Sequence, residues 1–188
     1  NQGISEKNIQ KMAKKASLSG VLFRPHFKTH QSIEIAKWFK KVGVKAITVS
    51  SIDMAESFAN AKWTDILIAI PVNTLELERV NSLAKRCQLH VLIDNLEALK
   101  QLHKTINTPV KLWIEIDTGH HRSGIHWAHI DDMALLIKES QKNPCLSLEG
   151  LLTHAGHSYD ARSSQEIRYI YEQSIIQLQN AKERLQAR

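Results

Sequence analysis

Cysteine is scarce in this chain, since only Cys87 and Cys145 occur among its 188 residues. The two cysteines form no CxxC pair, and neither has a histidine or a second cysteine beside it. We therefore expect no disulfide framework, and a reducing, cytoplasmic setting is the simplest interpretation.

Membrane and targeting features are also missing. No run of 18 apolar residues occurs, and residues 1–7 lack the charged-then-apolar pattern of a signal peptide. The net charge is +6, but the basic residues are scattered, with small clusters at helical spacing in 11–15 and 37–41. Such clusters are typical of solvated helix faces. We therefore expect neither a membrane nor a nucleic acid as a partner.

Three signatures of nucleotide and metal sites are absent as well. None of the seven glycines belongs to a GxGxxG fingerprint, and the chain contains no P-loop and no HExxH. A dinucleotide-binding sheet would need the glycine fingerprint in its first turn. The sequence therefore gives no support to that fold or to a helical zinc-binding histidine pair.

What the chain does contain is a regular alternation of β-rich runs and amphipathic segments. Gly43 follows one amphipathic segment as a stop signal, and Asp53 and Asn95 are expected N-caps. This alternation predicts an α/β fold with a parallel sheet. The expected strands are Val21–Phe23, Ala46–Ser50, Asp65–Ile70, Leu89–Ile93, Val110–Ile116 and Leu146–Thr153, and the expected helices are Gln31–Val42, Asp53–Ala61, Leu75–Arg86, Leu96–Ile106, His129–Lys142 and Gln165–Leu185.

The polar residues in the strands favour a TIM-type barrel over a doubly wound sheet. Arg24, His26 and Lys28 share one face of the first strand segment, and Glu115 alternates with isoleucines in the fifth. A doubly wound sheet buries both faces under apolar helices, whereas the mouth of a barrel tolerates polar inward side chains. A complete barrel has eight units and about 250 residues. We therefore expect residues 1–188 to form about six of eight units.

The first candidate motif is Arg24-Pro25-His26-Phe27-Lys28-Thr29-His30, at the rim of the expected sheet. Nearby positive charge and burial both lower the pKa of a lysine, and a neutral amine attacks a carbonyl to form a Schiff base. Lys28 is therefore a candidate nucleophile. The alternative is an ordinary surface lysine that follows a strand.

The second candidate motif, residues 117–124, places Arg122 between two glycines. The planar guanidinium suits a carboxylate, phosphate or phenolate oxygen. The alternative is a loop arginine paired with Asp117. The third motif, residues 153–159, contains His154, His157 and Tyr159. Its two histidines raise the alternative of a metal pair, although no third ligand is evident.

In this order, the three motifs resemble those of D-threonine aldolases and eukaryotic-type D-serine dehydratases. The 24–30 segment is similar to their cofactor-lysine motif, and 117–124 resembles a barrel loop that they share with alanine racemases. The segment Gly150–Tyr159 is similar to theirs after strand six. The resemblance covers nearly the whole chain and implies a fold-type III pyridoxal-phosphate enzyme with an alanine-racemase-like (β/α)8 barrel.

The resemblance also implies roles for particular residues. Lys28 would carry the cofactor as an internal aldimine and then act as an acid–base group. Tyr159 would lie near the cofactor or serve the second face. The other cofactor-binding residues implied are His26 and Arg24 beside the lysine, Arg122 near the phenolic oxygen or substrate carboxylate, and His154 at the rim.

The activity implied is that of a lyase or racemase acting on D-amino acids, working as a homodimer on a small amino-acid substrate. A divalent metal, zinc or manganese, is implied for the full-length protein, with ligands from a C-terminal β-domain that residues 1–188 do not contain. No residue of this chain is expected to bind that metal. The loops that grip the phosphate would follow strands seven and eight. We therefore expect residues 1–188 alone to be inactive.

Two other functions compete with this one. The first is a non-catalytic pyridoxal-phosphate-binding protein built on the same barrel. The second is a metal-dependent barrel hydrolase that uses His154, His157 and Asp117. The residues themselves do not choose between aldolase, dehydratase and racemase chemistry, because all three outcomes begin at the same substrate carbon.

Overall fold

The computed structural model describes residues 1–188, which alternate between helices and short parallel strands. The helices are α1 (Gln2–Leu18), α2 (Ile33–Lys41), α3 (Ile52–Asn60), α4 (Leu77–Ala84), α5 (Leu96–Thr105), α6 (Ile130–Ser140) and α7 (Ser164–Gln186). The strands are β1 (Ala46–Val49), β2 (Asp65–Pro71), β3 (Gln88–Ile93), β4 (Val110–Asp117), β5 (Ile125–His126) and β6 (Leu146–Leu152). Three 3₁₀ turns, η1 (Phe27–Thr29), η2 (Thr74–Glu76) and η3 (Gly156–Asp160), complete the fold.

The strands pair in parallel in the order β1-β2-β3-β4, and both β5 and β6 pair with β4. The register places Ala46 beside Asp65 and Asp65 beside Gln88. Parallel neighbours need a crossover connection, and helices supply it between the long strands. The carboxyl ends of all the strands therefore meet at the same edge of the sheet.

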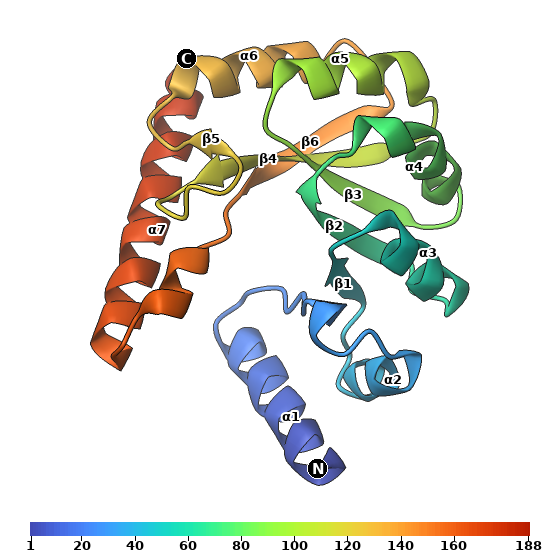
Figure 1. Ribbon diagram of the computed structural model, residues 1–188, viewed down its shortest axis with the longest axis vertical. Coiled ribbons are helices and arrows are strands. Elements are labelled where there is room, and N and C mark those ends of the chain that lie inside the picture. Colours follow the sequence, from blue (N-terminus) through green and yellow to red (C-terminus); the bar gives the residue numbers. More distant parts are fainter.

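Helices α2 to α6 form an arc around the outer side of the twisted sheet, and α1 and α7 stand at its two ends (Figure 1). The arc is open between α1 and α7. This is the arrangement expected of a barrel wall that has not closed.

The two faces of each strand carry different side chains. The face toward the helices is apolar and belongs to one core cluster that includes Ile47, Ile66, Leu89, Leu112 and Ile114, all of them fully buried. Burying such side chains contributes about 1.5–3 kcal/mol each before chain entropy is counted. The opposite face carries the intervening residues Thr48, Leu67, His90, Leu92 and Glu115. The inner side of the wall is thus partly polar.

The first predicted strand, Val21–Phe23, does not form in the structure. Residues 21–25 have no regular structure, and the segment joins the sheet only through an isolated bridge from His26 to Thr48. Arg24-Pro25 interrupts the pattern, since proline lacks the N–H that a strand ladder requires. The other five predicted strands are confirmed within one or two residues, and the two-residue strand β5 was missed.

The predicted helices are confirmed, with small shifts at their ends. Asn95 caps α5, and Gly43 follows α2 with a φ of 83°. The expected cap Asp53 is wrong, because Ser51 accepts the backbone N–H of Met54 and α3 starts earlier. Both cysteines are free, with Cys87 buried and Cys145 half-buried. None of the helices combines the length and apolar character needed to cross a membrane.

Candidate active site

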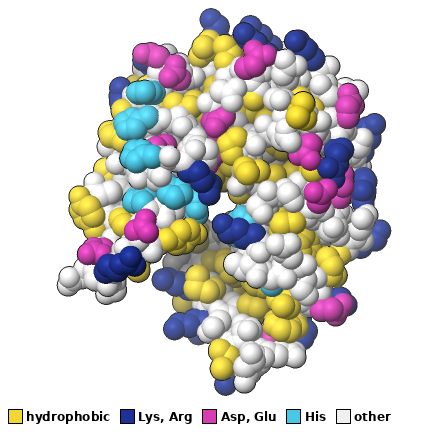
Figure 2. Space-filling view, in the orientation of Figure 1, with side chains coloured by type: hydrophobic (Ala, Val, Ile, Leu, Met, Phe, Trp, Pro, Cys, Tyr) yellow, Lys and Arg dark blue, Asp and Glu magenta, His cyan; other side chains and the backbone are white.

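A cavity of about 370 Å³ lies where the strands end. Its size falls within the range of small-molecule sites, about 300–1,000 Å³. Figure 2 shows His, Lys and Arg side chains gathered around a hollow on this face of the molecule. The lining residues are Arg24, His26, Lys28, Thr48, Ser50, Leu67, Ala69, Ile70, Glu115, Arg122, Leu152, Thr153 and His154.

The first motif reaches the cavity because its residues alternate in direction. Phe27 is fully buried, with ring centroids 5.0 Å from Phe39 and 5.1 Å from Phe58. Its neighbours on either side, His26 and Lys28, line the cavity instead. The His26 ring accepts the backbone N–H of Lys28 at 3.2 Å and so begins the η1 turn. The aromatic anchor thus fixes where the lysine emerges.

His30 does not join the charges around Lys28, contrary to the interpretation of the motif. Its ring packs on Phe27 and Phe39, at centroid distances of 4.6 Å and 5.8 Å, and does not line the cavity. Burial lowers the pKa of His30. The physical reason is the 3₁₀ turn at 27–29, which directs His30 toward the aromatic cluster.

Arg24 lines the cavity but carries a partner of its own. Its guanidinium donates to Asp65 Oδ1 at 2.7 Å and to the Ile47 carbonyl at 3.3 Å. His90 Nε2 lies 3.2 Å from the same carboxylate oxygen, and Trp113 Nε1 donates to His90 Nδ1 at 3.0 Å. Burial acts to raise the pKa of Asp65, but the hydrogen bonds from His90 and Arg24 lower it. The charge of Arg24 is therefore balanced by Asp65, and its side chain is fixed by these hydrogen bonds.

The two histidines of the cavity are held neutral near pH 7. Burial, followed by the charges of Lys28 and His154, lowers the pKa of His26 to about 4. Burial, followed by Arg122 and Lys28, also lowers the pKa of His154. A neutral His26 agrees with its Nδ1 accepting the Lys28 N–H, because a protonated imidazole has no free acceptor. In this tautomer the Nε2–H of His26 is left as a hydrogen-bond donor, whereas the neutral His154 ring keeps one nitrogen that can accept a hydrogen bond or a proton.

The second motif is organised by the Asp117 carboxylate. Asp117 Oδ1 accepts the backbone N–H groups of Gly119, His120 and His121 at 2.9–3.0 Å. Its other oxygen lies 2.8 Å from His121 Nδ1. Gly124 closes the loop at a φ of 96°, where an added Cβ would lie 3.0 Å from the backbone of Ile116 and Asp117. Only glycine fits a loop folded this tightly onto β4.

Arg122 does not pair with Asp117, which corrects the alternative that the sequence left open. Its guanidinium reaches into the cavity, and Nη2 lies 3.9 Å from Glu115 Oε1. Glu115 on β4 is only 2% exposed. Burial raises the pKa of Glu115, while the Ser123 hydrogen bond and the Arg122 charge oppose that change.

The third motif contributes His154 and Thr153 to the cavity, directly after β6. His120 lies edge-on to His154, with ring centroids 5.4 Å apart, and stacks against His157 at 6.5 Å. Tyr159 is 69% exposed and does not line the cavity, although its ring lies 5.8 Å from that of His154. The structure has no group of three or more His, Cys, Asp or Glu side chains suited to hold a metal. His154, His157 and Asp117 are therefore not assembled as a hydrolase centre.

The cavity thus brings together five of the six predicted site residues, which are Arg24, His26, Lys28, Arg122 and His154, and leaves Tyr159 at its rim. Sequence reasoning missed Glu115 as a site residue, together with Thr48. The signal for Glu115 was its place between Ile114 and Ile116 on a strand that is otherwise apolar.

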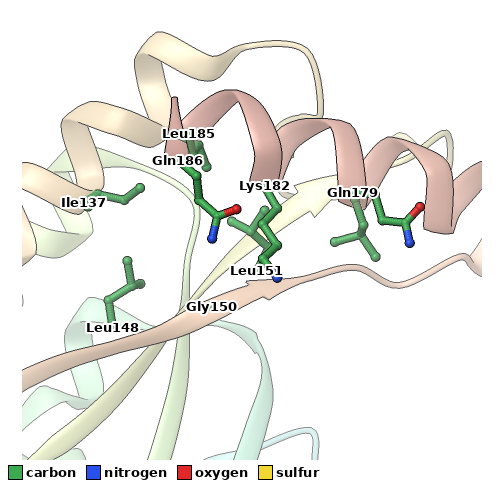
Figure 3. A pocket seen from close by; sticks show the side chains of 9 residues that line it. Ile137, Leu148, Gly150, Leu151, Gln179, Lys182, Leu185 and Gln186 are labelled. Carbon is green, nitrogen blue, oxygen red and sulfur yellow. The ribbon is translucent and has the colours of Figure 1, made fainter. Parts of the chain in front are cut away.

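A second cavity, of about 310 Å³, differs sharply in chemistry. It lies between β6 and α7, and Figure 3 shows Leu148, Leu151 and Leu185 around it, with Gln179 and Lys182 on the helix. No carboxylate or histidine lines it, so it contains no acid–base pair. The candidate active site is therefore the polar cavity.

Comparison with known proteins agrees with this assignment. The chain is 33% identical over 188 residues to a D-threo-3-hydroxyaspartate dehydratase of Delftia sp. strain HT23, covering 97% of this chain and 49% of that protein. It is 31% identical over 176 residues to a D-serine dehydratase of Dictyostelium discoideum, covering 86% of this chain and 44% of that protein. The solved structure of the Delftia dehydratase superimposes on this chain with a TM-score of 0.92 and 30% identity. The match covers 100% of this chain and 50% of the dehydratase chain.

The chain thus spans about half the length of the curated relatives it matches. Its likeness to the Delftia structure identifies the curved sheet as an incomplete parallel (β/α) barrel. The family model described as "Alanine racemase, N-terminal domain" matches residues 4–188. The chain belongs to the alanine racemase N-terminal domain family.

Proposed function

We propose that the protein containing this chain is a pyridoxal-phosphate-dependent lyase or racemase acting on D-amino acids. The observation that carries the proposal is the convergence of Lys28, His26, Arg122 and His154, from three separate motifs, on one cavity. The family match and the two dehydratases described above support it. The names of those relatives favour elimination of a β-hydroxyl group over the other outcomes.

The residues of the cavity fit the proposed cofactor. A primary amine, an arginine and two neutral histidines face a space large enough for a small aromatic phosphate. The Glu115 Oε2 atom is buried without a partner, which marks a polar position for a hydrogen-bond donor. When bound, pyridoxal phosphate supplies the electron sink that stabilises negative charge at the substrate Cα.

Each residue of this chain then has a defined task. Lys28 would provide the amine that holds the cofactor, and the same amine would move a proton at the substrate Cα. His26, which is neutral at pH 7, fixes the backbone of Lys28 through its 3.2 Å hydrogen bond. Arg122 donates to an anionic oxygen of the cofactor or substrate. His154 lies at the rim and is available to accept a proton.

Tyr159 belongs to the proposal as a second acid–base group. Its ring contacts that of His154 at the rim rather than in the cavity.

We propose that residues 1–188 are the barrel part of the protein, and that a β-domain outside them completes the site in a homodimer. A divalent metal that binds the β-hydroxyl of the substrate would take its ligands from that domain. A cytoplasmic location fits the two free thiols.

The proposal is tested by trapping the cofactor on its lysine. Full-length protein is incubated with pyridoxal phosphate, reduced with borohydride and digested, and the modified peptide is identified by mass spectrometry. We expect the label on Lys28, with Lys28→Ala unlabelled and its lyase activity at least about 100-fold lower. Lys37→Arg is the control, because Lys37 is exposed on α2 and paired with Glu34. Labelling at another lysine, or no labelling, would overturn the proposal.

The reaction is then identified from its products. D-Serine, D-threonine and D-threo-3-hydroxyaspartate are supplied in turn. Release of ammonia with a keto acid identifies a dehydratase, and release of glycine with an aldehyde or a keto acid identifies an aldolase. Deuterium exchange at Cα with inversion alone identifies a racemase. A protein that binds the cofactor on Lys28 yet releases none of these products and exchanges no Cα proton of any D-amino acid would instead be the non-catalytic binding protein.

A further inference from the structure

An ion pair between Arg24 and Asp65 lies at the amino ends of the strands, on the side of the polar cavity away from its rim. Asp65 is the first residue of β2 and does not line the cavity, whereas Leu67, two residues later on the same face, does. The side chains of Arg24 and Asp65 are only 15% and 25% exposed. Removing two charges from water costs free energy, so a pair in this position calls for an explanation.

The Asp65 carboxylate is held by three donors. Oδ1 accepts Arg24 Nη1 at 2.7 Å, and Oδ2 accepts Gln88 Nε2 at 3.1 Å. His90 Nε2 lies 3.2 Å from Oδ1. An indole N–H can only donate, so His90 Nδ1 accepts Trp113 Nε1 and the ring hydrogen stays on Nε2, directed at Asp65. The carboxylate is therefore a fixed point on the inner face of the sheet.

The Arg24 side chain connects this fixed point to a segment that has no strand ladder. Residues 21–25 meet β1 through one backbone hydrogen bond, from the Thr48 N–H to the Pro25 carbonyl at 2.9 Å. The Arg24 guanidinium adds two more hydrogen bonds, to Asp65 and, at 3.3 Å, to the Ile47 carbonyl. One arginine side chain therefore supplies most of the hydrogen bonds that tie this segment to β1 and β2.

Little freedom remains between Arg24 and the lysine four residues later. The ring of Pro25 locks its own φ. Phe27 is fully buried, and the His26 ring accepts the Lys28 N–H at 3.2 Å. A displacement at Arg24 is therefore passed on to Lys28 rather than absorbed between them.

We propose that Asp65 is a positioning residue for Lys28: by holding Arg24 from the far side of the cavity, it sets where the lysine amine enters that cavity. This inference rests on the proposed function, in which that amine binds pyridoxal phosphate. Asp65 itself touches neither cofactor nor substrate. Misplacing a reacting group by about 1 Å can slow its reaction about 100-fold, so even a small shift of the segment has a measurable effect.

The readout is the rate at which the cofactor becomes attached to Lys28, which requires no turnover. Full-length protein freed of cofactor is mixed with pyridoxal phosphate, samples are quenched with borohydride at intervals, and the labelled Lys28 peptide is quantified by mass spectrometry. We expect Asp65→Asn and Arg24→Met each to slow labelling about tenfold. The double variant should also be about tenfold slower rather than about 100-fold, because both substitutions remove the same link.

The double variant also separates positioning of Lys28 from stability of the fold. Each single variant leaves one charge without its partner, whereas the double variant removes both charges. We therefore expect the double variant to recover much of the urea midpoint that Asp65→Asn loses, while its labelling stays about tenfold slow. A role in stability alone would restore the labelling rate together with the midpoint.

A further variant serves if Asp65→Asn and the double variant fail to fold, as judged by circular dichroism. Arg24→Lys keeps the charge beside Asp65, but its side chain is shorter by one bond and lacks the planar fork. The segment must then move to keep the pair, and we expect labelling at least about threefold slower. An unchanged labelling rate in Arg24→Lys would overturn the inference.

The matched control breaks an ion pair of the same kind on the outer side of the sheet. Glu56 on α3 accepts Arg79 of α4 through both carboxylate oxygens, at 3.2 Å from Nε and 2.7 Å from Nη2. Glu56→Gln makes the same change of carboxylate to amide as Asp65→Asn, but neither partner lines the cavity. We expect it to change the labelling rate by less than about twofold.

The outcomes separate the two proposals. If borohydride does not fix the cofactor on Lys28 in the wild type, the proposed function fails before the variants are compared. If wild type is labelled but the two substitutions act additively, or the double variant is labelled at the wild-type rate, Asp65 does not work through Arg24 and only this inference is overturned. Slowing by Glu56→Gln as large as that by Asp65→Asn would overturn it as well.

Discussion

Residues 24–30 and residues 117–124 deliver side chains to the same cavity, but different forces hold the two segments. The first is anchored by Phe27, which is fully buried among aromatic rings. The second is anchored by Asp117, whose one oxygen accepts three backbone N–H groups. Apolar anchoring depends little on pH, whereas a carboxylate anchor depends on its charge. Lys28, the proposed nucleophile, therefore lies on a segment held by apolar packing, whereas Arg122, the proposed anion-binding residue, lies on a loop held by a carboxylate.

The largest loss of stability is expected when the aromatic anchor, Phe27, is removed. Phe27→Ala removes a ring that contacts Phe39, Phe58 and Trp63, and it leaves a cavity behind. We expect a loss of about 3–5 kcal/mol in the free energy of unfolding, measured by urea titration. Leu22→Ala serves as the control, because Leu22 is 70% exposed and should cost no more than about 0.5 kcal/mol. A loss below about 1 kcal/mol for Phe27→Ala would contradict the aromatic anchor.

The substitution Gly124→Ala tests how closely residues 117–124 fold back onto the backbone of β4. Gly124→Ala combines a positive φ with a Cβ at 3.0 Å from the β4 backbone, and we expect a cost of about 2–3 kcal/mol. Gly43→Ala is a matched control, because Gly43 has a φ of 83° but no heavy atom within 4 Å of a Cβ. It should show only the backbone strain, about 1 kcal/mol. Equal costs in urea titrations of the two variants would show that the close approach contributes nothing.

The carboxylate anchor predicts an acid-sensitive loop. Burial acts to raise the pKa of Asp117, but the backbone N–H groups and the His121 ring lower it below its ordinary value. The unfolded chain therefore binds the proton first, and this contribution to stability is lost as the pH falls below about 4. We expect Asp117→Asn to cost about 1 kcal/mol at pH 7 and less at pH 3. A cost that does not depend on pH would argue against the charged anchor.

At pH 7 the smallest effect on stability is expected at His26, because its shifted pKa changes stability only in more acidic solution. The folded pKa of His26 is about 4, below the ordinary value of about 6.5. Between these values the unfolded chain binds more protons, so stability falls as the pH drops from about 6.5 to about 4. His26→Gln retains a hydrogen-bond acceptor for Lys28 and removes this dependence. Urea titrations across that window check it, and an unchanged slope in the variant would contradict it.

Local pattern predicted much of this fold. Five of the six predicted strands and all six predicted helices were found, because alternating and helical periodicities are imposed by one buried core, whereas α1 was not among the predicted helices. The first strand failed because Pro25 has no N–H to donate, so the segment keeps only the bridge in which its carbonyl accepts the N–H of Thr48. The cap of α3 went to Ser51 rather than Asp53, a choice that depends on where the preceding strand stops. Strand β5 is only two residues long, too short to show a period.

The candidate site was predicted less completely than the fold. Lys28 and Arg122 were found because their motifs are local, whereas the partner of each side chain depends on elements distant in sequence. Arg24 pairs with Asp65, 41 residues away, and Arg122 faces Glu115 from a loop that turns back on itself. His30 points toward the aromatic cluster because of the 3₁₀ turn at 27–29, which the sequence pattern did not predict.

The isolated bridge between His26 and Thr48 has a consequence for motion around the proposed nucleophile. Residues 21–25 lack a strand ladder, whereas β3 is bonded to a neighbour on each side. Backbone with fewer hydrogen bonds opens locally at a lower free energy, and its amides exchange with solvent sooner. We expect the amides of residues 22–24 to exchange before those of β3. Such opening would widen the approach to the Lys28 amine while the helix-covered strands stay closed.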